Sequence, residues 1–222
     1  MILAQQIPLQ FEHRSALSCE DFLVSDSNRE AVEWIDHWPD WLSPTIAING
    51  PPGAGKTHLG VIFIEKTRGQ IFNAANPEAW VENAAGAWLV DDAQNFIDRA
   101  GERTFLHFYN AVIEAKGNIL LLDQAPPSQW PLSLPDLRSR MLTALVVEVL
   151  PPDDALLSAV LVKLLADRQL VVGTRVIDYV LPRMERSFIA AGNLVEGLDR
   201  LALAEKREIT IALAKRVLSG EF

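Results

Sequence analysis

The chain has 222 residues, of which 49% are hydrophobic and 22% charged; this suits one α/β domain plus a smaller appendage and excludes a disordered chain. Its 29 acidic residues outnumber its 20 basic residues and give a net charge of −9, which argues against direct coating of a nucleic-acid backbone. The single cysteine, Cys19, excludes an intramolecular disulfide, and no apolar run reaches the ~18 residues of a membrane span, so we expect a soluble cytoplasmic protein without a membrane partner.

Residues 4–11 form a short apolar segment ahead of the first predicted helix. Pro8 disfavours a helix here, and Ile7, Leu9 and Phe11 lie on one side of the segment if it is extended. An extended apolar segment suits a hydrophobic groove on another protein, and it equally suits a strand packed on its own domain. The composition of the segment leaves both interpretations open.

Strand-length apolar runs alternate with helix-length periodic segments from residue 28 to residue 150, which predicts a parallel sheet flanked by helices. The predicted strands are Thr45–Asn49, Gln70–Asn73, Ala87–Val90, Asn118–Leu122 and Leu145–Val149. The predicted helices are Asn28–Leu42, Lys56–Arg68, Pro77–Asn83, Arg103–Lys116 and Asp136–Leu142. The fold class is therefore α/β with a five-stranded parallel sheet.

The strand signal stops at Pro151 and Pro152, and the rest of the chain is predicted to be helical. Asp153 and Asp154 are suited to cap the first of these helices, and Gly192 with Asn193 is expected to separate the second from the third. We therefore expect a small helical domain after the α/β domain. Its predicted helices are Asp153–Arg168, Thr174–Ser187, Ala191–Glu205 and Thr210–Leu218.

The strongest motif is Gly50–Thr57, which matches G-x-x-x-x-G-K-[ST] between a predicted strand and a predicted helix. Such a loop turns backbone N–H groups towards a phosphate, while Lys56 reaches the β- and γ-phosphates and the Thr57 hydroxyl binds Mg²⁺. The alternative is a Gly/Pro-rich turn with an incidental Lys-Thr pair. Because a strand precedes the motif and a helix follows it, we expect ADP or ATP with Mg²⁺ as cofactors.

Carboxylates follow two further predicted strands. Asp91 and Asp92 come directly after Ala87–Val90, where Asp91 is suited to hold Mg²⁺ and Asp92 to orient the attacking water. The alternative is that the pair begins a turn or caps the next helix. Asp123 follows the fourth strand as a candidate γ-phosphate sensor, or as the start of the turn at residues 125–127, and spacing does not distinguish these two interpretations.

Together these motifs resemble the DnaA family of AAA+ proteins, and within it the short Hda type. The resemblance covers most of the chain and implies a P-loop core followed by a helical lid. The segments that carry it are Asp21–Val24, Ser27–Arg29, Gly50–Thr57, Val90–Phe96, Arg103–Ala111, Asp123 with Pro126 and Pro127, and Leu137–Arg140.

The resemblance also implies roles for individual residues. Arg140 would be an arginine finger that reaches a neighbouring subunit's nucleotide, with Asp92 and Asp123 as catalytic partners in the P-loop core; without the resemblance, Arg138 and Arg140 would be ordinary surface cations. The residues implied to contact the nucleotide are Leu23, Val24, Pro51, Pro52, Gly53, Ala54, Gly55, Lys56, Thr57 and His58, with Thr57 and Asp91 at Mg²⁺.

At the N-terminus, residues 6–11 resemble the motif by which Hda-type proteins bind the sliding clamp, the β subunit of DNA polymerase III. By this resemblance Gln6 hydrogen-bonds at the rim of the clamp pocket, Leu9 and Phe11 fill the pocket, and Ile7 is a further clamp-binding residue. The implied domains are a clamp-binding peptide (1–12), the AAA+ domain (13–150) and the lid (151–222).

Two departures from the DnaA pattern matter. The sequence carries no DNA-binding domain after the lid, so we expect DNA to be reached only indirectly. The sensor 2 arginine of the family falls on Ile189, where Arg183 or Arg186 would have to substitute, and we therefore expect weak intrinsic ATPase activity.

The resulting hypothesis is a regulator of replication initiation. It would bind DnaA and the clamp, stimulate hydrolysis of DnaA-bound ATP in trans, and assemble as a homodimer or AAA+ oligomer. The alternatives are an adaptor or loader that binds DnaA-like partners without promoting hydrolysis, and an autonomous ATPase motor.

Overall fold

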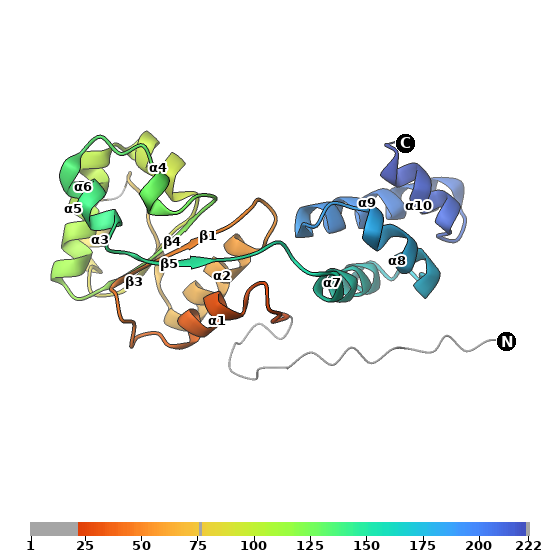
Figure 1. Ribbon diagram of the computed structural model, residues 1–222, viewed down its shortest axis with the longest axis horizontal. Coiled ribbons are helices and arrows are strands. Elements are labelled where there is room, and N and C mark those ends of the chain that lie inside the picture. Colours follow the sequence, from red (N-terminus) through yellow and green to blue (C-terminus); the bar gives the residue numbers. More distant parts are fainter. Residues whose placement is uncertain (1–21, 76, 221–222) are drawn as a thin grey trace. The chain divides into compact units, whose positions relative to one another are not determined.

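The computed structural model describes residues 22–75 and 77–220, which divide into two compact units. The core unit contains Phe22 and residues 28–150, and the helical unit contains Leu23–Ser27 and residues 151–220. Figure 1 shows that the described strands belong to the core unit.

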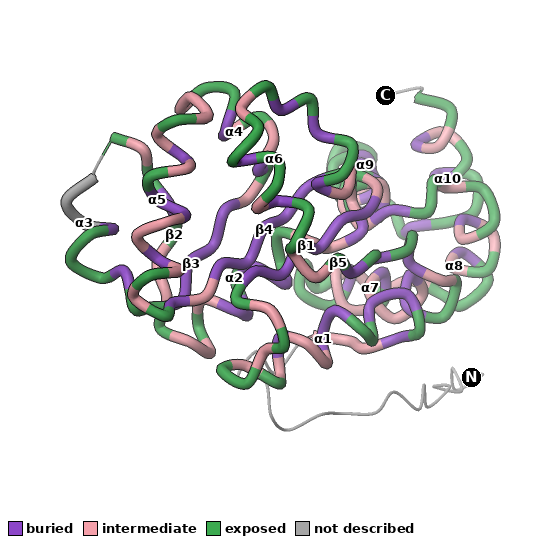
Figure 2. Tube along the Cα trace, turned by 60° about the vertical axis from the view of Figure 1, so that its left-hand side comes forward, coloured by how far each residue is buried: buried purple, intermediate pink, exposed green. Residues whose placement is uncertain are grey.

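The core unit is built on a five-stranded sheet in the order β2-β3-β4-β1-β5, with every neighbouring pair parallel. The central strands are apolar on both faces and almost wholly buried, as a parallel sheet covered by helices requires (Figure 2). The structure therefore confirms the predicted α/β fold. The strands are β1 (Thr45–Asn49), β2 (Gln70–Ile71), β3 (Ala87–Val90), β4 (Asn118–Asp123) and β5 (Leu145–Glu148).

Helices cover both faces of this sheet (Figure 1). One face carries α1 (Arg29–Asp36) and α2 (Lys56–Thr67). The other face carries α3 (Pro77–Glu82), α4 (Ala93–Ala100), α5 (Glu102–Glu114), the 3₁₀ turn η1 (Pro127–Gln129) and α6 (Pro135–Met141).

Three elements of the core unit differ from the sequence-based expectation. The first helix ends at Asp36 instead of Leu42, because Pro39 cannot continue a helix. Strand β2 has two residues, and residues 93–100 form a helix that the sequence analysis missed, although Ala93, Phe96, Ile97 and Ala100 follow the helical i, i+3, i+4, i+7 spacing. These differences leave the order of the predicted strands intact.

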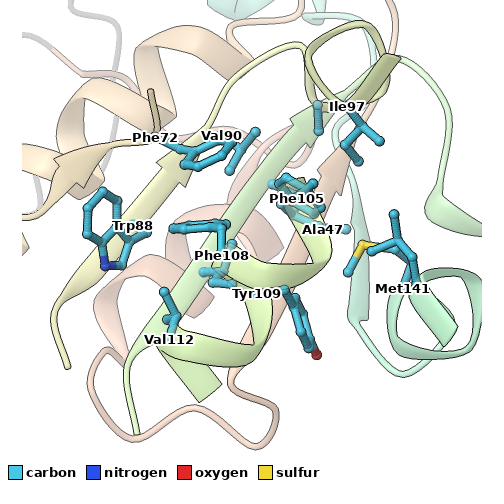
Figure 3. Close-up of a cluster of buried hydrophobic side chains, with 14 of the residues drawn as sticks. Ala47, Phe72, Trp88, Val90, Ile97, Phe105, Phe108, Tyr109, Val112 and Met141 are labelled. Atoms are coloured by element: carbon cyan, nitrogen blue, oxygen red, sulfur yellow. The ribbon is translucent and has the colours of Figure 1, made fainter. Parts of the chain in front are cut away.

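An aromatic cluster fills the space between the sheet and α5 (Figure 3). The Phe72 and Phe108 rings stack with centroids 4.0 Å apart, and Trp88 meets Phe108 edge to face at 5.3 Å. Burial of several large aromatic side chains supplies much of the hydrophobic stabilisation on this face. It therefore fixes α5, and with α5 the helices packed against it.

The helical unit is a small bundle with its own hydrophobic core. Asp153 caps the first helix as predicted, accepting a hydrogen bond from Leu156 N at 2.7 Å. Its helices are α7 (Asp154–Asp167), α8 (Thr174–Val180), the 3₁₀ turn η2 (Leu181–Arg183), α9 (Phe188–Glu205) and α10 (Ile211–Leu218).

The break expected at Gly192 and Asn193 is wrong, because α9 runs through both residues. Glycine inside a helix costs about 1 kcal/mol relative to alanine, which the buried face of α9 outweighs. The separation from α8 lies earlier, where Ser187 caps α9 by accepting a hydrogen bond from Ala190 N at 3.1 Å. Tertiary packing thus overrides the local glycine signal.

Candidate functional site

The segment Gly50–Thr57 connects the carboxyl end of β1 to the start of α2, as predicted. Gly53 and Gly55 have φ angles of 72° and 95°, in the left-handed region that other residues rarely adopt. Gly55 is the N-cap residue of α2, so unpaired backbone N–H groups of the first turn lie at the loop. The loop has the backbone that a phosphate site requires.

Lys56 folds back over this loop. Its Nζ donates hydrogen bonds to the carbonyl oxygens of Gly50 at 2.7 Å and Pro51 at 2.9 Å. Burial lowers the pKa of Lys56, while the charges of Asp123 and Asp91 oppose that change. The ammonium group therefore lies at the loop, within electrostatic reach of both carboxylates.

The two carboxylates after β3 differ in their surroundings. Asp91 is half-buried and its Oδ1 accepts a hydrogen bond from Asp92 N at 2.9 Å. Asp92 is exposed, has a left-handed φ of 55°, and accepts hydrogen bonds from Asn95 Nδ2 at 2.9 and 3.1 Å. Asp92 occupies the N-cap position of α4 without capping it by a side-chain hydrogen bond, which weakens the helix-cap alternative.

Asp123 ends β4 and joins two turns. Its Oδ2 accepts a hydrogen bond from Gln94 N at 2.7 Å, and its Oδ1 accepts from Gln124 N at 2.6 Å and Ala125 N at 3.3 Å. The bonds to Gln124 and Ala125 are those expected of a residue that begins a turn. The bond to Gln94, which the sequence did not predict, ties the first turn of α4 to the end of β4.

Arg140 lies near the end of α6 and is half-buried, whereas Arg138 is exposed. The Arg140 guanidinium carbon is 5.9 Å from the centroid of the Tyr109 ring, and its Nε is 3.2 Å from Asp136 Oδ1. An aromatic ring and a carboxylate one turn earlier therefore lie beside the arginine, although its Nε makes no hydrogen bond among the described residues.

The position of Arg140 relative to the strands is decisive. Thr45, the first residue of β1, donates a hydrogen bond from Oγ1 to the Tyr109 hydroxyl at 3.5 Å, so the Tyr109–Arg140 pair belongs to the amino end of β1. The phosphate loop begins just after Asn49, the other end of β1, which lies about 13 Å from Thr45 at ~3.3 Å per residue. Within the core unit, Arg140 and the phosphate loop therefore lie at opposite ends of the sheet.

In the helical unit, the position predicted for the sensor 2 arginine holds Ile189, whose side chain is 58% exposed. Arg183 Nη1 donates a hydrogen bond to Tyr179 O at 2.8 Å and its guanidinium stacks 4.1 Å over the Tyr179 ring. Arg186 pairs with Asp154 at 2.8 Å. Both candidate substitutes therefore have partners inside the helical unit.

The remaining predicted contacts are divided between the units. Leu23 and Val24 are half-buried residues of the helical unit, and His58, on α2, meets Phe22 edge to face at 5.2 Å. Pro51 and Pro52 lie in the phosphate loop with the buried Ala54. The predicted clamp-binding residues Gln6, Ile7, Leu9 and Phe11 lie outside the described residues.

A cavity of about 450 Å³ lies elsewhere in the core unit, at the amino ends of β2 and β3. Gln70 and Ala87 open these strands and line the cavity together with Trp38 and Arg68. It lies at the opposite end of the strands from Asp91 and the phosphate loop, so it is distinct from the candidate site.

No cluster of three or more His, Cys, Asp or Glu side chains suited to a metal ion occurs within residues 22–75 and 77–220. In the same part of the chain, none of the helices combines the length and apolar character needed to cross a membrane.

Comparisons with known proteins agree with this architecture. Residues 154–218 match the family model of the Hda lid domain. A Haemophilus influenzae protein described as uncharacterized is 26% identical over 97% of this chain and 99% of its own length.

Among solved structures, domain III of the Thermotoga maritima replication initiation protein DnaA matches with a TM-score of 0.74, at 20% identity over 90% of this chain and 95% of its own. AMPPCP-bound DnaA from Aquifex aeolicus matches with a TM-score of 0.63, at 23% identity over 87% and 67% of the two chains. These likenesses confirm the predicted AAA+ fold.

Proposed function

On the premise that this chain is an AAA+ protein related to Hda and DnaA, we propose that it regulates replication initiation by acting on the nucleotide of a DnaA partner. It binds adenine nucleotide at Gly50–Thr57 and presents Arg140 to ATP held by DnaA. The observation that carries this proposal is the location of Arg140 at the end of the sheet opposite its own phosphate loop.

The loop residues fit an adenine nucleotide with Mg²⁺. The left-handed glycines leave room for a phosphate group, and the Thr57 hydroxyl and Asp91 carboxylate are oxygen ligands of the kind Mg²⁺ prefers. Lys56 would exchange the Gly50 and Pro51 carbonyls for phosphate oxygens. When bound, the magnesium nucleotide supplies the phosphate charge that orders the loop.

Arg140 would act in the partner's site rather than its own. A guanidinium supplied in trans stabilises the charge that develops on the γ-phosphoryl oxygens, an effect of ~10³ to 10⁵ in rate in other P-loop systems. Asp136 and the Tyr109 ring would hold the side chain ready before the partner arrives. In the chain's own site, Asp92 keeps the catalytic role predicted for it.

Recruitment to DNA would be indirect. In this proposal residues Gln6, Ile7, Leu9 and Phe11 bind the sliding clamp, and the clamp brings the protein to initiator on DNA. The sequence pattern of residues 6–11 supports this step, and the acidic net charge of −9 is consistent with it.

Turnover of ATP by DnaA tests the proposal directly. We expect the unmodified chain with clamp-loaded DNA to stimulate turnover, Arg140→Ala to reduce the stimulation at least 100-fold, and Arg138→Ala, a matched control on the same helix, to leave it within about twofold. Full stimulation by Arg140→Ala would rule out the arginine-finger role. A lack of stimulation by the unmodified chain would refute the proposed function.

A second candidate is an adaptor that binds DnaA without promoting hydrolysis. It is favoured by the exposed Ile189 at the sensor 2 position and by the internal partners of Arg183 and Arg186. The turnover assay separates the two candidates, because an adaptor binds DnaA and leaves its rate of hydrolysis unchanged.

A further inference from the structure

Asn49, the last residue of β1, is a buried polar side chain without a role in the site described so far. It is 8% exposed, and its Oδ1 is buried without a hydrogen-bond partner among the described residues. An amide oxygen buried in this way costs free energy, because its bonds to water are lost and nothing replaces them. Asn49 directly precedes Gly50, the first residue of the phosphate loop.

The register places Asn49 beside the end of β4. Asn49 is aligned with Asp123 on one side and with Glu148 of β5 on the other. Side chains alternate along a strand, and Ala47 and Leu121, two residues before Asn49 and Asp123, both pack in the aromatic cluster. Asn49 and Asp123 therefore leave the sheet on the same face.

Asp123 is poorly suited to contact a phosphate directly. Both of its oxygens already accept backbone hydrogen bonds, from Gln94 on one side and from Gln124 and Ala125 on the other. An ionised carboxylate also has no proton to donate to a phosphate oxygen and repels it by charge. The same repulsion applies to Glu148, so of the three aligned residues only Asn49 is neutral and carries N–H donors.

We propose that Asn49 recognises the γ-phosphate of ATP bound at Gly50–Thr57. Its side-chain amide N–H group donates a hydrogen bond to a γ-phosphate oxygen. Asp123 then has a positioning role, joining the first turn of α4 to the end of β4. This inference rests on the proposed function, since it requires a nucleotide at the loop.

The test is equilibrium binding of ADP and of a non-hydrolysable ATP analogue to the full chain. We expect Asn49→Ala and the near-isosteric Asn49→Leu to weaken binding of the ATP analogue about 10-fold relative to ADP. Asn118→Ala, at the amino end of the same sheet, is the matched control and should leave the ratio unchanged. Without nucleotide, the Tm of Asn49→Leu should equal or exceed that of the unmodified chain, because an unpaired polar group has been removed.

The outcomes separate this inference from the proposed function. If the unmodified chain binds both nucleotides and the two Asn49 variants keep its ATP-to-ADP ratio, Asn49 does not sense the γ-phosphate. Equal weakening of both nucleotides, with a lowered Tm, would likewise assign it a merely structural role. If the unmodified chain binds neither nucleotide, and so does not differ from Lys56→Ala, the proposed function fails and this inference fails with it.

Discussion

At the residue scale, the site depends on a few polar side chains set into an apolar framework. Lys56 bonds to two carbonyls of the phosphate loop, Asp123 to three backbone N–H groups, and Arg140 lies against the Tyr109 ring. Each contact holds a charged group in one geometry before any partner binds. Such preorganisation lowers the entropic cost of the later encounter.

Tyr109 offers a specific test of how Arg140 is positioned. We expect Tyr109→Leu to reduce stimulated turnover of DnaA-bound ATP about 10-fold, because the aromatic face under the guanidinium is lost. Tyr109→Phe keeps the ring and should retain at least half of the stimulation. The comparison requires turnover of DnaA-bound ATP at a saturating concentration of each variant, with binding of the variant to DnaA measured separately.

Two results would contradict this role. If Tyr109→Leu kept full stimulation, the ring would be irrelevant to the finger. If Tyr109→Phe lost as much activity as Tyr109→Leu, the hydroxyl bond to Thr45 would matter instead of the ring.

At the element scale, α6 is anchored to α5 through Glu102. The Glu102 Oε1 accepts hydrogen bonds from Ser133 N and Ser133 Oγ, both at 2.8 Å, and its Oε2 accepts from Leu134 N. These bonds to the residues just before α6 lower the pKa of Glu102, since they favour its ionised form. The segment that leads to Arg140 is therefore fixed at its start by a carboxylate.

The pH dependence of stability follows from the sign of this shift. A carboxyl group whose pKa is lower in the folded state stabilises the protein above its unfolded pKa, and that stabilisation is lost as the pH falls through the folded pKa. We expect Glu102→Gln to lower the Tm by about 2 °C at pH 7, as exposed charged hydrogen bonds contribute ~0.5 kcal/mol. The difference should shrink as the pH falls below the ordinary pKa of a glutamate, about 4.3, and should vanish below the lowered folded-state pKa of Glu102.

Thermal unfolding at pH 7 and at low pH measures this difference, and Glu114→Gln, at the other end of α5, is the matched control. A difference between Glu102→Gln and the unmodified chain that persisted unchanged into acid would show that the carboxylate charge is not what anchors the loop.

At the scale of the whole molecule, two units with separate cores carry different parts of the proposed function. The core unit holds the phosphate loop and Arg140, and the helical unit holds the match to the Hda lid domain. The proposed clamp contact belongs to neither set of described residues. Its residues 6–11 are distant in sequence from Gly50–Thr57, so the two proposed contacts can be mutated independently.

That separation gives a prediction about the clamp. Leu9→Ala combined with Phe11→Ala should weaken binding to the isolated clamp at least 30-fold, since two buried apolar anchors are lost, while nucleotide binding stays unchanged. Surface-immobilised clamp measures the first quantity and a nucleotide titration the second. Clamp binding that survives the double substitution would remove this role from residues 6–11.

The sequence by itself determined the order of the five strands along the chain, the helical nature of residues 153–218 and the location of the phosphate loop. These features follow from local signals: apolar runs of strand length, an Asp that caps a helix, and glycines where the backbone must be left-handed. The resemblance to the DnaA family added the AAA+ fold, which the structure and the comparisons confirm.

Only the tertiary structure decided which of these residues share a site. The strand order 2-3-4-1-5 places Asn49 beside Asp123 and puts Arg140 at the far end of the sheet, and no local pattern encodes either relation. Tertiary packing also lets α9 continue through Gly192, because burial of a helix face outweighs the low helix propensity of one residue. Contacts between residues distant in the chain depend on how whole elements pack, whereas turns, caps and strands depend on their neighbours in sequence.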